Sequence, residues 1–254
     1  MSELAHRTIL VTGASKGIGA AIVQALGAGG ASVIAHYGTD EAGAREATAA
    51  IPQDRKLLVA ADLADPDAPA RLWAEAVAWR GGVDTFVSNA AIMSESPLDA
   101  ADADWDRTWE TTLRVNVLAA ASLMRQAVRH FQERGGGVLV TLSSWAAQRG
   151  AGNSNLVAYA ASKAAVKAMA QTIARNHAAE GVLSYVVAPG VVRTRMSERA
   201  AASRGGEETL TATLAMGEWV SPSEVAALVA FLATGRARHL TGATLDVNGA
   251  SYIR

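Results

Sequence analysis

Cysteine is absent from the 254-residue sequence, which excludes a disulfide framework and thiolate chemistry. The sequence also has no excess of either charge, because 23 lysines and arginines balance 24 aspartates and glutamates and leave a formal net charge of -1. It therefore contains neither a basic nucleic-acid-binding footprint nor an acidic tail. Hydrophobic residues make up 50% and charged residues only 19%, so a small-molecule role fits better.

Long hydrophobic runs are absent from the start of the chain. The apolar stretch within residues 1–12 is too short for a secretory signal peptide or a membrane span, so we expect a cytoplasmic protein without a membrane partner. The five histidines show no metal-ligand spacing such as H-E-x-x-H, and we expect no metal site. Since no linker, repeat or low-complexity tract divides the sequence, we expect one domain spanning residues 1–254.

A glycine-rich loop stands between the first predicted strand and the first predicted helix. The apolar run Thr8–Val11 leads into Thr12-Gly13-Ala-Ser-Lys-Gly17-Ile-Gly19, and helix-favouring residues follow from Ala20 to Leu26. This order places backbone N–H groups and the positive end of a helix dipole where a pyrophosphate can bind. The spacing G-x-x-x-G-x-G differs from the dinucleotide fingerprint G-x-G-x-x-G, so a glycine turn without a ligand stays open for this motif alone.

Strand and helix patterns alternate along the rest of the chain, which predicts βαβ units and a parallel sheet. The further predicted strands are 31–36, 56–61, 83–88, 137–142, 182–187 and 243–247. The further predicted helices are 40–50, 66–79, 103–133, 157–179 and 222–233, the last with Ser221 as N-cap. Segment 193–217 shows no regular pattern, and such long irregular segments in compact domains are usually lids or disordered.

The end of the second strand bears on cofactor choice, because an acidic side chain there accepts from a ribose 2′-hydroxyl and repels a 2′-phosphate. Residues 36–39 read His-Tyr-Gly-Thr and contain no carboxylate. Asp40 and Glu41 are interpreted as the start of the next helix, where acidic residues are favoured. Lys16 in the glycine loop adds a cation on the same side. We therefore favour NADP(H) as the cofactor, with NAD(H) as the alternative.

Tyr159 and Lys163 are four residues apart in a helix-favouring segment and so share a helix face. A free phenol has a pKa of about 10, whereas a group that moves protons near neutrality needs a pKa of about 7. The difference is about 4 kcal/mol, which a cation about 4 Å away supplies at an effective dielectric of about 20. The pair predicts an acid/base site in which Lys163 lowers the pKa of Tyr159; an incidental surface pair is the alternative.

Polar residues at other predicted strand ends and in the long helical region are further candidates. Ser144 follows the fifth strand, where it can donate to a substrate oxygen or cap a turn, and Ser143 is the alternative. No G-x-S-x-G setting accompanies it, which disfavours a serine hydrolase. Asn116 lies among apolar residues and needs partners if buried. Trp145 and Trp219 are candidate walls of a substrate pocket.

Taken together, these motifs resemble the short-chain dehydrogenase/reductase family over essentially the whole chain. The resemblance rests on the glycine loop, Asp62, Asn89-Ala90-Ala91, the set Asn116, Ser144, Tyr159 and Lys163, then Pro189-Gly190 with Thr194, and Val247-Asn248-Gly249. Ala91 stands where the family usually has glycine. The ending Thr241-Gly242 to Val247-Asn248-Gly249 is similar to that of 3-oxoacyl-[acyl-carrier-protein] reductases.

The resemblance implies an α/β fold: a single-domain, Rossmann-type, doubly wound parallel sheet of seven strands with helices on both faces. It implies a cofactor half at about residues 1–135, a catalytic and substrate half at about 136–254, and a substrate lid at about 193–217. The implied cofactor-binding residues are Gly13, Ser15, Lys16, Gly17, Ile18, Gly19, Tyr37, Gly38, Thr39, Asp62, Leu63, Asn89, Ala90, Ala91, Tyr159, Lys163, Pro189, Gly190, Val192 and Thr194.

The implied reaction is reversible hydride transfer between nicotinamide and a carbonyl or secondary alcohol. Tyr159 would exchange the proton, Ser144 would bind the carbonyl oxygen, Lys163 would bind the nicotinamide ribose and lower the pKa of Tyr159, and Asn116 would support a proton-relay water. The substrate would be a 3-oxoacyl thioester or another ketone, and the protein a homotetramer or homodimer. Two alternatives stay open: an NAD(H)-dependent alcohol or sugar dehydrogenase of the same family, and a nicotinamide-binding sensor or scaffold without turnover.

Overall fold

Seven parallel strands form one sheet in the order β3-β2-β1-β4-β5-β6-β7. The computed structural model describes residues 3–202 and 205–254, so residues 1–2 of the predicted domain and 203–204 of the predicted lid lie outside the described residues. The strands are β1 (Thr8–Val11), β2 (Ser32–Tyr37), β3 (Lys56–Ala60), β4 (Thr85–Ser88), β5 (Gly137–Leu142), β6 (Val182–Pro189) and β7 (Thr244–Val247). The strand order reverses between β1 and β4, which confirms the predicted doubly wound sheet.

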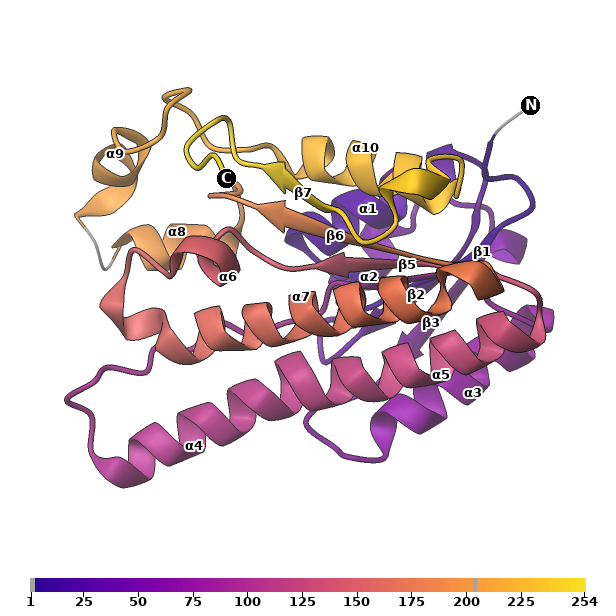
Figure 1. Cartoon of the computed structure of the whole chain (residues 1–254), viewed down its shortest axis with the longest axis horizontal. Coiled ribbons are helices and arrows are strands. Elements are labelled where there is room, and N and C mark those ends of the chain that lie inside the picture. The colour runs from indigo at the N-terminus through magenta and orange to yellow at the C-terminus, as the bar shows by residue number, and fades with distance from the viewer. Residues whose placement is uncertain (1–2, 203–204) are drawn as a thin grey trace.

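Helices cover both faces of this sheet, with α1 and α10 on one side and α3, α5 and α7 on the other (Figure 1). The α-helices are α1 (Gly17–Ala28), α2 (Glu41–Ala47), α3 (Ala68–Arg80), α4 (Asp102–Leu113), α5 (Ala120–Glu133), α6 (Ala146–Arg149), α7 (Val157–His177), α8 (Arg195–Ala202), α9 (Gly206–Thr211) and α10 (Pro222–Ala233). Shorter helical turns are η1 (Gln53–Arg55), the π-helical η2 (Arg114–Ala119), η3 (Ser154–Leu156), η4 (Ala178–Glu180) and η5 (Arg238–Leu240). No helix in the described parts of the chain is long and apolar enough to cross a membrane.

Alternation along each strand divides the core into two layers, because successive side chains of a strand point to opposite faces. In β1, Ile9 and Val11 pack in the layer beneath α1 and α10, whereas Leu10 packs in the layer beneath α3 and α5. All three side chains are fully buried. Strands covered on both faces are near-continuous hydrophobic runs, which is why β1 is so easily identified in the sequence.

Helices α1 and α2 both begin next to a strand end at the carboxyl edge of the sheet. Helix α1 begins at Gly17, inside the glycine loop, and not at Ala20 as predicted. Helix α2 begins after Asp40, whose side chain accepts a 3.0 Å hydrogen bond from the backbone N–H of Gly43. Asp40 is therefore a helix cap, as its interpretation from the sequence required.

The long predicted helix 103–133 is interrupted by the π-helical turn η2 at Arg114–Ala119, which contains Asn116. Such turns inside α-helices are frequent at functional sites. Sequence periodicity did not reveal this irregularity, because the wider turn adds only one residue to an otherwise continuous helical pattern.

The interpretation of 193–217 as a segment without regular structure was wrong for α8 and α9. Ala201 of α8, Leu210 of α9 and Leu214, which follows α9, are buried with Trp219 in a small hydrophobic cluster of their own. We call this cluster the lid core. Its members lie 9, 4 and 5 residues apart, a spacing that forms no continuous helical stripe, so sequence periodicity does not reveal the cluster.

Candidate active site

The carboxyl ends of β1, β4, β5 and β6 meet at one edge of the sheet, because the strands are parallel. Thr12 and Asn89 join two of these ends through reciprocal hydrogen bonds. The hydroxyl of Thr12 accepts from the backbone N–H groups of Asn89 (3.0 Å) and Ala90 (3.2 Å). The Asn89 amide donates to the carbonyls of Thr12 (2.8 Å) and Gly13 (3.1 Å). Asn89 and Ala90 thus hold the start of the glycine loop against the end of β4.

The glycine loop has no room for a side chain at Gly13 or Gly19. A Cβ atom on Gly19 would lie 2.0 Å from the carbonyl oxygen of Gly13, and one on Gly13 would lie 2.9 Å from Cα of Ala90. Gly13 and Gly17 also have positive φ angles of 69° and 56°, which other L-residues rarely adopt. Close-packed backbone at a helix N-terminus is the arrangement that accepts a pyrophosphate, so the loop fits the phosphates of a dinucleotide.

The segment after β6 lies against the glycine loop, as the predicted cofactor site requires. A Cβ on Gly17 would lie 3.1 Å from Cγ2 of Thr194, which brings this segment against the glycine loop. The backbone N–H of Gly190 donates to the carbonyl of Val247 (2.9 Å), and Val192 pairs with Val220 in an isolated parallel bridge. Residues 189–194 are therefore held between β7 and the segment that enters α10.

His36, at the end of β2, is a residue of this site that sequence reasoning did not select. Its Nδ1 accepts from the backbone N–H of Gly13 (3.1 Å), and its Nε2 lies 3.0 Å from the carbonyl of Ala61, to which it donates. Burial lowers the pKa of His36, so the ring is neutral at pH 7. His36 links the glycine loop to the end of β3. A histidine in an otherwise apolar strand was the available signal.

The remaining predicted cofactor residues line the same edge with different exposures. Lys16, Gly38, Thr39 and Asp62 are exposed, while Ser15, Ile18, Tyr37 and Ala91 are partly buried and Leu63 is buried. Asp62 accepts a 2.9 Å hydrogen bond from the backbone N–H of Ala64, which holds the turn after β3.

Helix α7 carries Tyr159 and Lys163 on one face, and Lys163 is buried. The Lys163 ammonium donates a 2.8 Å hydrogen bond to the carbonyl of Leu142 and lies 5.9 Å from the centre of the Tyr159 ring. The hydroxyl of Ser143 donates to the backbone carbonyl of Lys163 (2.9 Å), so Ser143 joins β5 to α7. The side chain of Ser144 instead lies close enough to the phenol of Tyr159 to lower the pKa of the phenol. This geometry favours Ser144 over Ser143 as the serine of the site.

The pKa of Tyr159 shifts in the direction opposite to the predicted one, and Lys163 is not among the causes of that shift. Burial raises the pKa of the Tyr159 phenol above 10.0, and only the side chain of Ser144 opposes that rise. Burial also lowers the pKa of Lys163 from 10.5 to about 8, which leaves the ammonium protonated at neutral pH. The reason for the error is that the estimate from the sequence omitted desolvation of both groups. The phenol keeps its proton at pH 7 and is able to donate it to an oxyanion.

Asn116 is buried and joins three segments of the site. Its Oδ1 accepts from the backbone N–H of Ile92 (2.8 Å), and its Nδ2 donates to the carbonyl of Ile92 (2.9 Å) and to the hydroxyl of Ser162 (3.0 Å). Ser162 in turn donates to the carbonyl of Tyr159 (2.7 Å). The side chain of Asn116 therefore connects η2, the segment after β4 and the Tyr159 turn of α7.

The two candidate tryptophans lie on the lid side of the site. Trp145 follows Ser144 directly, is partly buried and packs against the lid core. Trp219 belongs to the lid core itself, with only 5% of its surface exposed. Its Nε1 donates a 2.8 Å hydrogen bond to the Thr211 hydroxyl. Trp145 contacts both the catalytic segment and the lid core, whereas Trp219 supports the lid core from inside.

A comparison with protein families matches residues 13–250 to the model described as Enoyl-(Acyl carrier protein) reductase. The chain is 34% identical over 256 residues to 3beta-hydroxysteroid dehydrogenase 1 of Eggerthella lenta, which covers 97% of this chain and 94% of that protein. It is 33% identical over 244 residues to the 3-oxoacyl-[acyl-carrier-protein] reductase FabG of Escherichia coli, with 96% of each chain covered.

Solved structures show the same architecture. A putative NAD(P) dependent gluconate 5-dehydrogenase from Beutenbergia cavernae, with bound NADP at low occupancy, has a TM-score of 0.88 at 33% identity and covers 99% of both chains. A 3-ketoacyl-(acyl-carrier-protein) reductase from Brucella melitensis complexed with NADH has a TM-score of 0.86 at 26% identity, covering 98% of this chain and 99% of that one. The chain therefore belongs to the short-chain dehydrogenase/reductase family of NAD(P)-dependent oxidoreductases.

Proposed function

We propose that this protein transfers a hydride between NADP(H) and a ketone or secondary alcohol, with Tyr159 as the general acid and base. The observation that carries the proposal is the pairing of the Tyr159 phenol with the Ser144 side chain beside the buried Lys163 ammonium. The nicotinamide, when bound, supplies or accepts the hydride. In the reducing direction Ser144 holds the carbonyl oxygen and Tyr159 gives its proton to the developing alkoxide.

Lys163 and Asn116 have supporting roles in this proposal. Lys163 is protonated at neutral pH, and its hydrogen bond to Leu142 fixes the position of the ammonium. We propose that the ammonium there binds the hydroxyls of the nicotinamide ribose. Asn116 holds the turn of α7 that carries Tyr159, and we propose that its segment also supports the water through which the phenol regains a proton.

The preference for NADP(H) over NAD(H) is supported by the end of β2. No carboxylate stands in residues 36–39, and Asp40 is occupied as the cap of α2. Lys16 is exposed next to the first turn of α1, where it can meet a 2′-phosphate. The solved relatives hold NADP in one case and NADH in another, so the ratio of kcat/KM for NADPH and NADH is the direct test. A higher kcat/KM with NADH would instead support the alternative, an NAD(H)-dependent alcohol or sugar dehydrogenase.

The substrate class we propose is a ketone or secondary alcohol, with 3-oxoacyl thioesters as the first candidates. Relatives that act on a hydroxysteroid and on 3-oxoacyl chains match this chain to nearly the same degree. Trp145 would form the wall of the pocket beside the reacting oxygen, Trp219 would support the lid, and residues 193–217 would cover the substrate. Residues 1–135 would hold most of the cofactor and residues 136–254 the catalytic and substrate side.

A screen of ketones that follows NADPH absorbance tests the proposed function. We expect turnover by the native chain, and we expect Tyr159→Phe to lower kcat by about 100-fold or more while NADPH still binds. Phenylalanine is the matched replacement because it keeps the ring and removes only the hydroxyl. Turnover by Tyr159→Phe at the native rate would contradict the role of Tyr159. NADPH binding without turnover of any ketone would favour the sensor or scaffold.

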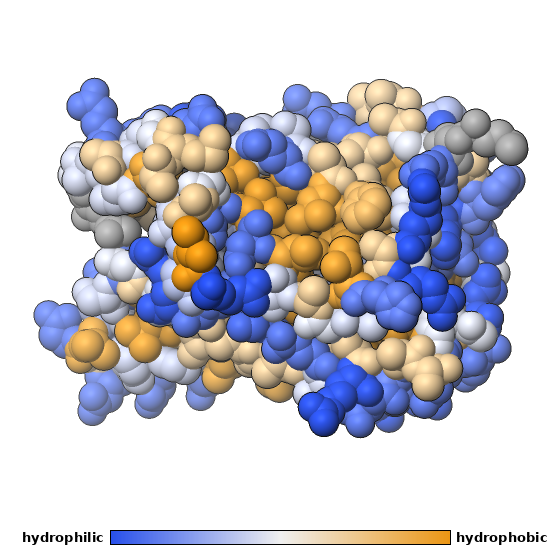
Figure 2. Space-filling view, turned by 45° about the horizontal axis from the view of Figure 1, so that its top comes forward, coloured by the Kyte–Doolittle hydropathy of each residue, from blue (hydrophilic) through white to orange (hydrophobic). Residues whose placement is uncertain are grey.

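For assembly and location we propose a cytoplasmic homotetramer or homodimer. A hydrophobic area lies on the face formed by α10 and β7, bordered by hydrophilic residues (Figure 2). Phe231 of α10 is 46% exposed, and a contiguous apolar area of this kind typically marks an interaction surface. Sedimentation analysis of the purified protein measures the number of subunits, and a monomer at all concentrations would contradict this proposal.

A further inference from the structure

Helix α6 begins two residues after Ser144 and is too short to be stable by itself. It contains four residues, Ala146–Arg149, and isolated helices of that length are unstable. At its start, the Ser144 hydroxyl accepts from the backbone N–H of Ala146 (3.1 Å). The backbone N–H of Trp145 donates to the carbonyl of Pro189 (3.0 Å). The other end of α6 needs a separate anchor.

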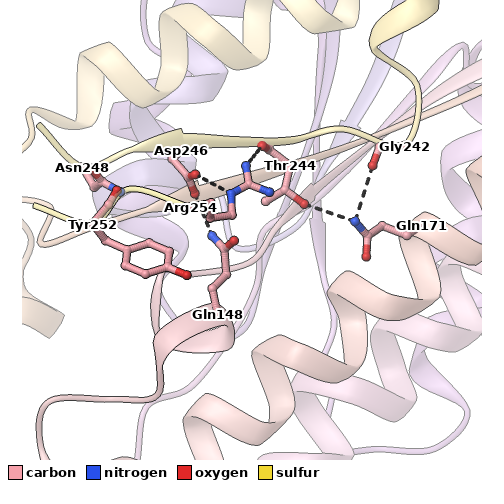
Figure 3. A network of polar contacts seen from close by, with 8 residues as sticks. All are labelled: Gln148, Gln171, Gly242, Thr244, Asp246, Asn248, Tyr252 and Arg254. Carbon is pink, nitrogen blue, oxygen red and sulfur yellow. Dashed lines mark hydrogen bonds and ion pairs between the residues drawn. The ribbon is translucent and has the colours of Figure 1, made fainter. Parts of the chain in front are cut away.

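Gln148 provides that anchor by reaching strand β7 (Figure 3). Its Nε2 donates a 2.7 Å hydrogen bond to Oδ1 of Asp246, 98 residues away in the sequence. Its Oε1 is buried and has no hydrogen-bond partner among the described residues. Rotating the amide would turn that oxygen toward the carboxylate, so Asp246 determines the orientation of Gln148.

The second oxygen of the Asp246 carboxylate is held by Arg254. Arg254 Nε donates to Oδ2 of Asp246 (2.9 Å), and the same guanidinium donates to the backbone carbonyl of Thr244. The side chain of Asp246 is 21% exposed and that of Arg254 is 43% exposed, so solvent only partly screens the pair. Arg254 thereby fixes the carboxylate in the orientation that Gln148 requires.

Strand β7 is also in contact with the helix that carries Tyr159. Gln171 of α7 donates to the hydroxyl of Thr244 (3.4 Å), and Thr244 lies two residues before Asp246 in β7 (Figure 3). The segment that carries Ser144 and the helix that carries Tyr159 are therefore both hydrogen-bonded to β7. A small displacement of α6 relative to β7 therefore changes the distance between the hydroxyls of Ser144 and Tyr159.

We propose that Asp246 is a positioning residue: through Gln148, and oriented by Arg254, it holds α6 so that Ser144 meets Tyr159. This inference rests on the proposed function of Ser144 and Tyr159. Misplacing a catalytic group by about 1 Å costs up to about 100-fold in rate, so a contact outside the reacting atoms has a measurable effect.

Three variants separate the contact from the charge. Gln148→Glu keeps the size of the side chain and places a carboxylate against Asp246, so we expect kcat to fall roughly tenfold or more. Asp246→Ala removes the acceptor, and we expect a similar fall. Asp246→Asn still offers an oxygen to Gln148 but loses the ion pair with Arg254 that orients it, so we expect kcat to fall less than in Asp246→Ala. KM for NADPH should not change in any of them.

A pH profile distinguishes positioning from a loss of stability. Because the side chain of Ser144 lowers the pKa of Tyr159, moving Ser144 away raises that pKa. In the direction of alcohol oxidation, the rise of kcat/KM with pH should shift upward in Gln148→Glu and Asp246→Ala, and by less in Asp246→Asn. Glu3→Ala is the control, because it removes the carboxylate of another arginine pair, with Arg236, outside this network.

An ultraviolet titration of the phenolate gives a readout that needs no substrate. The difference between each variant and the same variant carrying Tyr159→Phe reports the titration of Tyr159 alone. If the native chain turns over no ketone, the proposed function fails, and the titration still tests the position of Ser144. Native kcat and an unshifted Tyr159 titration in both Gln148→Glu and Asp246→Ala would overturn the inference. Where Asp246→Ala fails to fold, Gln148→Glu and Asp246→Asn carry the same comparison.

Discussion

The ammonium of Lys163 donates a 2.8 Å hydrogen bond to the backbone carbonyl of Leu142, two residues before Ser144. The same ammonium lies over the Tyr159 ring, 5.9 Å from its centre. One buried lysine therefore links the end of β5 to the helix that carries the phenol. Burial lowers the pKa of Lys163 from 10.5 to about 8.

The stability of the protein without nicotinamide should depend on pH through Lys163. Its folded pKa is about 8 and its ordinary value is 10.5, so between these values the unfolded chain binds more protons. The free energy of unfolding contributed by this group should therefore rise as the pH increases from about 8 to 10.5. Urea unfolding of the native chain and of Lys163→Met at pH 7.5, 9 and 10.5 measures the difference. A constant difference across this range would contradict the lowered pKa.

His36 should make the glycine loop sensitive to acid. The neutral ring accepts from Gly13 through Nδ1, and protonation removes that acceptor. The pKa of His36 is lowered, so its contribution to stability is complete above the ordinary value of 6.5 and decreases as the pH falls below it. Unfolding of the native chain and of His36→Asn should differ most above pH 7 and least near pH 5. His130 also has a lowered pKa, which makes the His36→Asn comparison necessary.

Gly19→Ala should abolish tight binding of the cofactor. Its Cβ would lie 2.0 Å from the carbonyl oxygen of Gly13, so the loop or the start of α1 must move. We expect the Kd for NADPH to rise by at least about tenfold, which corresponds to about 1.4 kcal/mol. Gln24→Ala is the matched control, since Gln24 is exposed on the same helix. Fluorescence titration with NADPH measures both, and equal Kd values would show that the loop tolerates the side chain.

Trp219→Ala should loosen the lid core and leave the rest of the fold intact. Trp219 packs with Ala201, Leu210 and Leu214, apart from the two main layers of the core. Truncating a buried tryptophan costs about 3–5 kcal/mol, and here that loss falls on a local unit. We expect faster proteolysis within 193–217 and a raised KM for the ketone, with a small change in Tm. Trp219→Phe should restore most of the packing. A large drop in Tm with unchanged lid proteolysis would mean that the lid core is not a separate unit.

The sequence by itself determined the order of the strands along the chain, the glycine loop and the residues that we propose as the catalytic set. These features are local. A buried β-strand such as β1 is a run of apolar residues, a phosphate loop needs Gly13, Gly17 and Gly19 at fixed spacing, and Tyr159 and Lys163 share a face because of helix geometry. Asp40 was also interpreted correctly, because a helix cap depends on its immediate neighbours.

Only the tertiary structure decided the direction of the Tyr159 pKa shift, the contacts of His36 and Asp246, and the helices α8 and α9. Each of these depends on contacts between distant residues: His36 with Gly13 and Ala61, or Asp246 with Gln148. Burial is likewise a property of the folded chain, and it reversed the expected direction of the Tyr159 pKa. Local spacing specifies which groups are present, whereas desolvation and long-range hydrogen bonds specify how they behave.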